Sequence, residues 1–214
     1  MLQSVWARLP TELKTNVRKW RYKRQIKAGN FRSPELEFNH LERYIKPSDW
    51  VMDIGANVGH YTLEMARLVG KGGRVVAFEP IPDTFSLLTL NVHAAGYHNV
   101  TLINAAVSDR CWLAGFEMPD GNPYRAHISE ASTNKILCVS PVAFSGSDHR
   151  ISFIKIDAEG HEPQIVEALE PLIQHNRPVL MVECNTEFLE SWTDRNQYRF
   201  NDIQNSHNHI LEPV

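Results

Sequence analysis

The sequence predicts an α/β fold with a Rossmann-like, mostly parallel sheet flanked by helices and a basic helical extension at the N-terminus. Short apolar runs, of the kind buried on both faces of a sheet, alternate with longer helical stretches. This alternation is typical of parallel strands joined by right-handed crossovers. A concentration of positive charge in residues 1–32 predicts the separate extension.

The extension is expected to cover residues 1–45. Residues 10–28 predict a basic helix that ends at Gly29 and Asn30, which form a good helix stop. Residues 34–44 predict a second helix, with Ser33 as its N-cap and Pro34 at the first helical position.

The sheet is expected within residues 46–190. The predicted strands are residues 50–54, 74–78, 100–103, 151–156 and 179–182, and the predicted helices are 58–69, 83–95 and 162–175. Residues 111–147 break this pattern and predict a strand only at 135–139. An irregular stretch of that length in a compact domain is usually functional, so we expect a lid or substrate loop there. Residues 191–214 are expected to form a polar tail.

Charge is distributed unevenly along the chain. Residues 1–32 contain nine Lys or Arg and one acidic residue, which leaves 13 basic and 24 acidic residues in the remainder. The basic segment is compatible with a membrane surface, an acidic substrate or nucleic acid as its partner. A solvated helix that lies against the acidic body is the favoured interpretation.

The compartment is expected to be the cytoplasm. No apolar run reaches the length of a membrane-spanning helix, and the N-terminus lacks the apolar core of a signal peptide. The three cysteines are scattered and have no metal-ligand spacing, which is typical of reduced thiols. The sequence gives no indication of oligomeric state.

Four of the five predicted strands end in an acid, at Asp53, Glu79, Asp157 and Glu183. Ligands of open parallel sheets bind just outside the carboxyl ends of the strands. Burying an unpaired carboxylate is costly, so packing alone gives no reason for these endings. Together they predict a cationic or polyhydroxylated ligand along this edge.

A glycine-rich turn follows the first strand. Gly55 and Gly59 permit a tight turn and a close approach of the backbone to a ligand. Asn57 and His60 stand where a dinucleotide fingerprint needs glycine, and no phosphate-binding lysine follows. The turn therefore favours a ligand without phosphate, an amino-acid moiety joined to a nucleoside, for which Glu79 has the spacing of a ribose-binding acid.

Four segments resemble the FkbM-type methyltransferases: residues 53–62, 78–80, 104–109 and 154–162. The likeness extends over residues 46–185 and implies a class I methyltransferase fold with S-adenosylmethionine as the methyl donor. It implies that the methionine part is surrounded by Asp53, Gly55, Asn57 and Gly59, the ribose bound by Glu79, and the adenine flanked by Asn104, Ala105 and Ala106.

The resemblance also indicates where the reaction occurs. It places the reactive end of the donor beside the loop after residues 151–156, so Glu159 and His161 are candidates for a general base and Asp157 for orienting the substrates. His161 is also suited to capping the following helix. A divalent cation is chemically possible at these carboxylates, but no ligand spacing indicates one.

The expected activity is O-methylation of a small molecule, sugar or glycan hydroxyl. Two alternatives remain open. The chain is short after Glu183 for the last strands of the family's sheet, which allows a degenerate donor-binding module with a regulatory or scaffold role. The basic segment allows an RNA-directed or membrane-associated methyltransferase.

Overall fold

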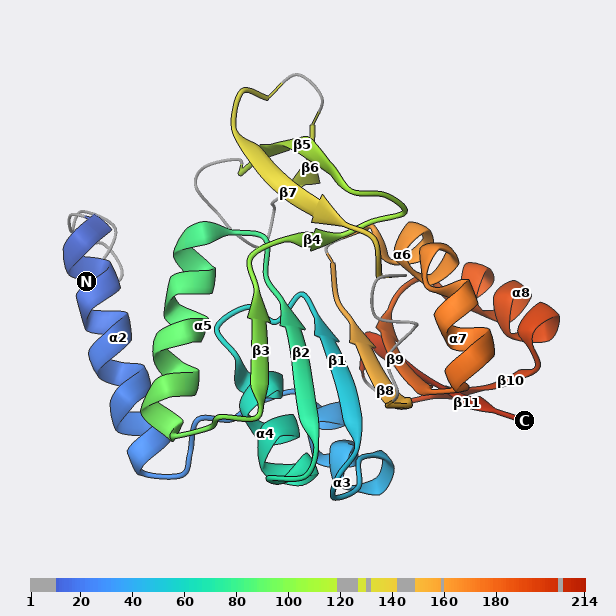
Figure 1. Cartoon of the computed structure of the whole chain (residues 1–214), viewed down its shortest axis with the longest axis horizontal. Helices are drawn as coiled ribbons and strands as arrows, with labels where there is room; N and C mark the ends of the chain where they lie inside the picture. Colours follow the sequence, from blue (N-terminus) through green and yellow to red (C-terminus); the bar gives the residue numbers. More distant parts are fainter. Residues whose placement is uncertain (1–10, 119–126, 130–131, 142–148, 159, 204–205) are drawn as a thin grey trace.

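One mostly parallel sheet organises the chain. The computed structural model describes residues 11–118, 127–129, 132–141, 149–158, 160–203 and 206–214, and within them seven strands pair in the order β10-β11-β9-β8-β1-β2-β3 (Figure 1). The pairs from β9 to β3 are parallel, and β11 pairs antiparallel with both β9 and β10. The predicted α/β fold is therefore confirmed. The strands are β1 (Trp50–Ile54), β2 (Arg74–Phe78), β3 (Val100–Ile103), β8 (Ile151–Ile156), β9 (Val179–Glu183), β10 (Tyr198–Asp202) and β11 (Asn208–Pro213).

Successive side chains of the central strands point into two separate cores, because a strand alternates its faces. Val51 and Phe153 bury into one core with residues of α4 (His60–Val69) and α5 (Pro82–Ala95). Met52 and Ile154 bury into the other with residues of α6 (Glu162–Ala168), α7 (Glu170–Asn176) and α8 (Thr186–Asn196). Both faces of the sheet are thus covered, as its apolar strands require.

The predicted helix at 162–175 is two helices, α6 and α7. Pro171 is the second residue of α7, where its ring and its missing N–H would interrupt a continuous helix.

The N-terminal segment contains α2 (Thr11–Lys27), η1 (Leu36–His40) and α3 (Leu41–Tyr44). The second predicted helix therefore starts later than Pro34. The Ser33 hydroxyl accepts the N–H of Glu35 at 3.3 Å and donates to the Glu35 carboxylate at 2.9 Å. Because this local turn occupies the hydroxyl, Ser33 is not an N-cap. None of the described helices is long and apolar enough to cross a bilayer.

Part of the segment expected to be irregular forms a small second sheet. It contains β4 (Ala106–Val107), β5 (Trp112–Glu117), β6 (His127–Ile128) and the expected strand β7 (Lys135–Val139), in the order β4-β7-β5-β6. Ala114 and Phe116 of β5 bury with Ile136 and Cys138 of β7 and with Ile81. This sheet covers the carboxyl edge of the large one (Figure 1).

The expected polar tail is also wrong. After α8 the chain forms the hairpin β10–β11, and β11 extends the large sheet beside β9. Its buried residues include Ile210 and Leu211, which enter opposite cores. Antiparallel edge strands with polar outer positions lack the continuous apolar run of a parallel strand, which is why the sequence pattern missed them.

Candidate functional site

A cavity of about 510 Å³ lies at the carboxyl ends of the parallel strands. It is lined from four different strands by Asp53, Glu79, Asp157 and Glu183, the acids singled out in the sequence. Parallel strands end at a common edge, so residues more than a hundred positions apart face one space. The small sheet contributes Phe116 and Ile136 to the lining.

The glycine turn after β1 is shaped by its neighbours in the protein. Gly55 has a φ of +80°, and a Cβ on it would lie 1.7 Å from the carbonyl oxygen of Asp157. Asn57 has a φ of +50°. Gly59 has a φ of +96°, and a Cβ on it would lie 2.7 Å from Cδ1 of Leu88. Gly55 and Asn57 line the cavity, whereas Gly59 is not among its lining residues and serves the packing of α4 against α5.

Asp53 is fully buried at the end of β1 and lines the cavity. Its Oδ2 accepts a hydrogen bond from the Thr62 hydroxyl at 2.5 Å, but its Oδ1 has no partner among the described residues. Burial raises the pKa of Asp53, whereas the positive charge of Lys155 lowers it. A buried acceptor left unpartnered costs free energy, so Oδ1 is suited to a donor or a cation brought by a ligand.

Glu79 joins the end of β2 to the glycine turn. It is 4% exposed, and its two oxygens accept the N–H groups of Asn57 and Ile81, each at 2.9 Å. Burial raises the pKa of Glu79 to about 7, although the two N–H bonds act in the opposite direction. Each carboxylate oxygen keeps a further lone pair, so the group can still accept hydrogen bonds from a diol.

Of the three residues expected beside the adenine, two line the cavity and one does not. Ala105, Ala106 and Ile81 line the cavity, and Ala106 packs against the hydrophobic cluster that contains Ile81. Asn104 does not, because its side-chain amide donates to the carbonyl oxygens of Glu79 at 2.8 Å and Pro80 at 3.1 Å. Asn104 therefore positions the Glu79 turn.

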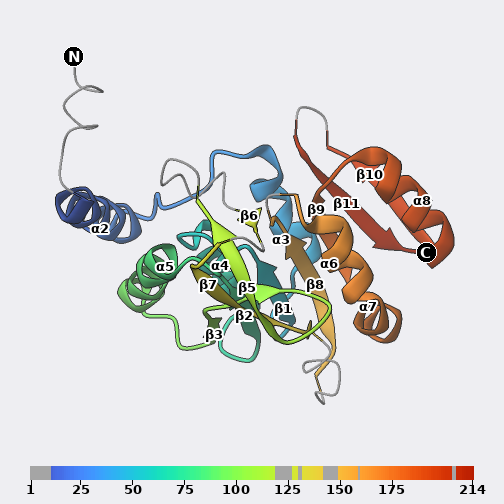
Figure 2. The same ribbon diagram turned by 90° about the horizontal axis from the view of Figure 1, so that it is seen from above.

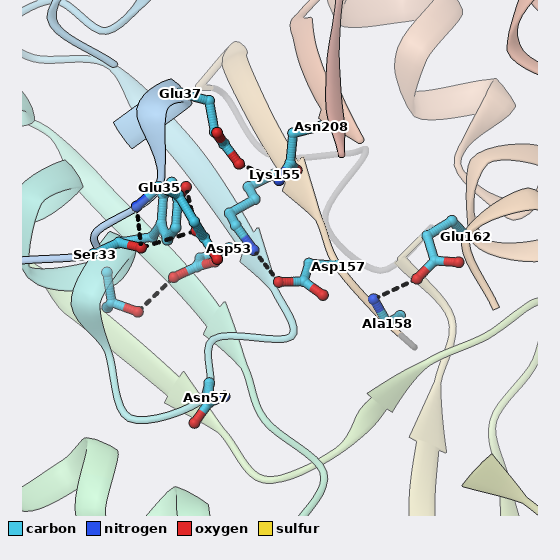
Figure 3. Close-up of polar contacts among 12 residues, drawn as sticks. Ser33, Glu35, Glu37, Asp53, Asn57, Lys155, Asp157, Ala158, Glu162 and Asn208 are labelled. Atoms are coloured by element: carbon cyan, nitrogen blue, oxygen red, sulfur yellow. Dashed lines mark hydrogen bonds and ion pairs between the residues drawn. The ribbon is translucent and has the colours of Figure 1, made fainter. Parts of the chain in front are cut away.

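Lys155 also lines the cavity, although it is not among the predicted site residues. It is 2% exposed, and its Nζ lies 2.8 Å from Oδ2 of Asp157 (Figure 3). The same nitrogen lies 4.6 Å from the ring centre of Tyr61. Burial by itself lowers the pKa of Lys155, but the Asp157 and Asp53 carboxylates outweigh it and raise the pKa. Lys155 thus remains a cation. The available signal was a lysine inside the apolar run of β8, because a buried charge needs partners.

The N-terminal segment contributes Glu35, a second cavity residue that was not predicted from the sequence. The Glu35 carboxylate accepts a hydrogen bond from the Ser33 hydroxyl at 2.9 Å (Figure 3). It also accepts one from the Tyr61 hydroxyl at 2.7 Å, and all three residues line the cavity. Burial and the bond to Glu35 raise the pKa of Tyr61 above its ordinary value, so its hydroxyl keeps its proton.

The loop after β8 holds the expected catalytic groups. Asp157 and His161 line the cavity, and the His161 side chain makes no capping hydrogen bond to α6. Glu159 lies outside the described residues. Glu162 accepts hydrogen bonds from the N–H groups of Ala158 and Gly160, which hold these two residues of the loop in place.

The fourth acid of the cavity is Glu183, at the end of β9. Burial and the nearby Asp157 raise the pKa of Glu183. Within the residues described, no group of three or more metal-ligating side chains could hold a metal ion.

The sequence that forms this cavity matches a known protein family. The profile of the methyltransferase FkbM domain matches residues 53–212. Over 129 residues the chain is 26% identical to the hexuronic acid methyltransferase AglP of Haloferax volcanii, covering 59% of this chain and 52% of that protein.

Two solved structures share the fold. The methyltransferase FkbM from Methylobacillus flagellatus has a TM-score of 0.57 at 14% identity, with 82% of this chain and 50% of that chain covered. Aeropyrum pernix fibrillarin, solved with natively bound S-adenosyl-L-methionine, has a TM-score of 0.51 at 13% identity, covering 78% and 67%. The chain spans about half the length of AglP and of the Methylobacillus protein. Because the family profile covers most of the sequence, this chain belongs to the FkbM methyltransferase family.

Proposed function

We propose that this protein transfers a methyl group from S-adenosylmethionine, the donor that its family implies, to an oxygen atom of a small molecule, sugar or glycan. The observation that carries the proposal is the convergence of the glycine turn, the buried Asp53 and Glu79 on one cavity. A hexuronic acid methyltransferase among the relatives supports a sugar as the acceptor.

The residues present fit the donor. The unpartnered Oδ1 of Asp53 is suited to the positive charge of the methionine part, next to Gly55 and Asn57. Glu79 has free lone pairs for the ribose hydroxyls. Ala105 and Ala106, with Ile81, form an apolar wall suited to the adenine. We assign Gly59 and Asn104 to the support of these groups, since neither lines the cavity.

On the acceptor side, the donor's sulfonium supplies an activated methyl group, so the protein mainly has to align the acceptor oxygen with it. His161 lines the cavity and has no capping bond, which leaves its imidazole available as the base that removes the hydroxyl proton. Glu159 is the other candidate. Asp157, held by Lys155 at 2.8 Å, orients the reacting groups.

The alternative of a degenerate donor-binding module assumed that the last strands of the sheet are missing. Within the described residues the large sheet has seven strands, with β10 and β11 in place, so no observation favours that alternative.

The test is turnover with methyl-labelled S-adenosylmethionine and a panel of uronic acids, neutral sugars and phenols. A general base contributes roughly 10²–10⁴-fold to a rate. We therefore expect His161→Ala or Glu159→Ala to lower kcat on that scale while the donor Kd changes little. Full turnover in both variants would show that neither residue is the general base. Absence of labelled product with every hydroxyl compound tested would contradict the proposed acceptor class.

A further inference from the structure

The outer face of α2 carries a row of exposed apolar side chains. Leu13, Val17 and Trp20 are 46%, 38% and 63% exposed. Residues separated by three or four positions lie on one side of a helix, so the three form a single stripe. The same spacing of apolar residues continues in the preceding sequence at Leu2, Trp6 and Leu9.

The opposite face of α2 packs against the body of the protein, so the Leu13–Val17–Trp20 stripe faces outward. Tyr22 is 8% exposed and packs edge-on against Phe31, with ring centres 5.3 Å apart, and also against His60. Ile26 packs against the same core. The helix lies alongside α5 on the side away from the sheet (Figure 2). The core uses the Tyr22 face, and the Leu13–Val17–Trp20 stripe lies outside the hydrophobic core clusters.

Basic residues border the stripe on both sides. At about 100° per residue, Lys14 and Arg21 fall on one side of it and Lys23 on the other, with Lys19 further round the helix. Arg24 and Lys27 continue the row beyond Trp20. The helix contains seven basic residues and one acidic residue, Glu12.

Most of this charge is not paired with a carboxylate in the part of the chain that the structure describes. Among the described parts of the chain, no ion pair to a carboxylate is formed by Arg18, Lys19, Arg21, Lys23, Arg24 or Lys27. Arg24 lies over the ring of Trp20 at 5.6 Å instead. The charge therefore remains available to an external anionic partner.

We infer that α2 is a docking surface for an anionic lipid bilayer. An apolar stripe with a tryptophan, bordered by Lys and Arg, is the composition of a helix that lies in the membrane interface. The basic residues are attracted to anionic headgroups while the stripe enters the acyl boundary. A nucleic acid would use the same charges but would leave Leu13 and Val17 without a role, so the stripe favours lipid.

The experiment is co-sedimentation of the full chain with phosphatidylcholine vesicles, with and without about 30% phosphatidylglycerol. We expect at least about tenfold tighter binding to the anionic vesicles at low salt, weakened strongly at about 0.5 M salt by screening. Trp20→Glu and the triple variant Lys19→Gln/Lys23→Gln/Lys27→Gln should each lose most of this binding. Because all four side chains are exposed, unfolding by urea should be unchanged.

Two matched controls test the placement of the surface. Leu113 is 64% exposed on β5, and Leu113→Glu should keep vesicle binding. Lys71 and Lys135 are exposed outside α2, and Lys71→Gln/Lys135→Gln should keep it as well. The inference is overturned by absence of binding to anionic vesicles at low salt, or by full binding in Trp20→Glu. It is also overturned if single-stranded RNA displaces the vesicles and binds the Trp20→Glu variant as tightly as the wild type, because the surface would then serve nucleic acid.

Discussion

The ammonium nitrogen of Lys155 lies 2.8 Å from Oδ2 of Asp157, in a strand position that is 2% exposed. Lys155 also attracts the fully buried Asp53, so one cation offsets two carboxylates of the donor cavity. Lys155 therefore connects Asp157, at the end of β8, with Asp53, at the end of β1. The stability of the cavity therefore depends on Lys155 and on the groups that hold Asp53 and the turn beside it.

Replacing Lys155 with Met should destabilise the protein. Removing one partner of a buried ion pair typically costs about 3–5 kcal/mol, because the other charge is left uncompensated. The free energy of unfolding in urea should fall by about this amount. Lys135→Met, at an exposed position in β7, is the control and should change stability little. Adding Asp53→Asn to Lys155→Met should restore part of the loss, and no restoration would argue against the shared cation.

Replacing Thr62 with Val should raise the cost of burying Asp53. The Thr62 hydroxyl makes the only hydrogen bond that the described residues give to the Asp53 carboxylate. Leaving a buried acceptor unsatisfied costs about 1–3 kcal/mol, which urea unfolding measures. Thr89 in α5 donates to the Phe85 carbonyl from an exposed position, so Thr89→Val should cost much less. Equal losses in the two variants would contradict this role of Thr62.

Replacing Gly55 with Ala should prevent normal closure of the turn. The new Cβ would lie 1.7 Å from the Asp157 carbonyl oxygen, at a φ of +80°. Gly96 has a similar φ of +75°, and a Cβ on it would meet nothing within 4 Å, so Gly96→Ala should cost only the left-handed backbone penalty, roughly 1–2 kcal/mol. Circular dichroism and urea unfolding should show a much larger loss for Gly55→Ala. Comparable stability of the two variants would contradict the steric account.

Donor affinity should depend on pH through Glu79. Its pKa is raised to about 7 by burial, so below pH 7 the group is mostly protonated, whereas the ribose hydroxyls bind best to the ionised form. The affinity should therefore fall as the pH drops through 7, approaching about tenfold per pH unit for one linked proton. Titration calorimetry from pH 8 to pH 5.5 measures the slope. Glu79→Gln should remove it, and an unchanged slope in that variant would assign the proton to another group.

Much of the site was predictable because it depends on a regular feature of parallel sheets. Asp53, Glu79, Asp157 and Glu183 end strands that share one edge, and all four line the cavity. Lys155 was not identified because its role depends on which strands are neighbours, and β1 pairs with β8 only across a large sequence separation.

The rest of the fold that was not predicted includes α8 and several strands that pair antiparallel. β5 contains Gly115, where a Cβ would lie 2.0 Å from the Ser129 carbonyl oxygen, and a glycine normally weakens a strand prediction. β10 and β11 carry polar residues such as Asn201 and Asn208. Their pairing is stabilised by contacts from elsewhere in the chain, including the bond from the Asn208 amide to the buried Glu37 carboxylate (Figure 3).

The most direct test of the central claim is isothermal titration of the protein with S-adenosylmethionine, beside NAD as a control and with the Glu79→Ala variant. Binding of S-adenosylmethionine alone is the predicted result, with a loss of about 1–3 kcal/mol in Glu79→Ala, the scale of a charge-assisted hydrogen bond. Absence of S-adenosylmethionine binding, or binding that Glu79→Ala leaves unchanged, would contradict the assignment of this cavity to the methyl donor.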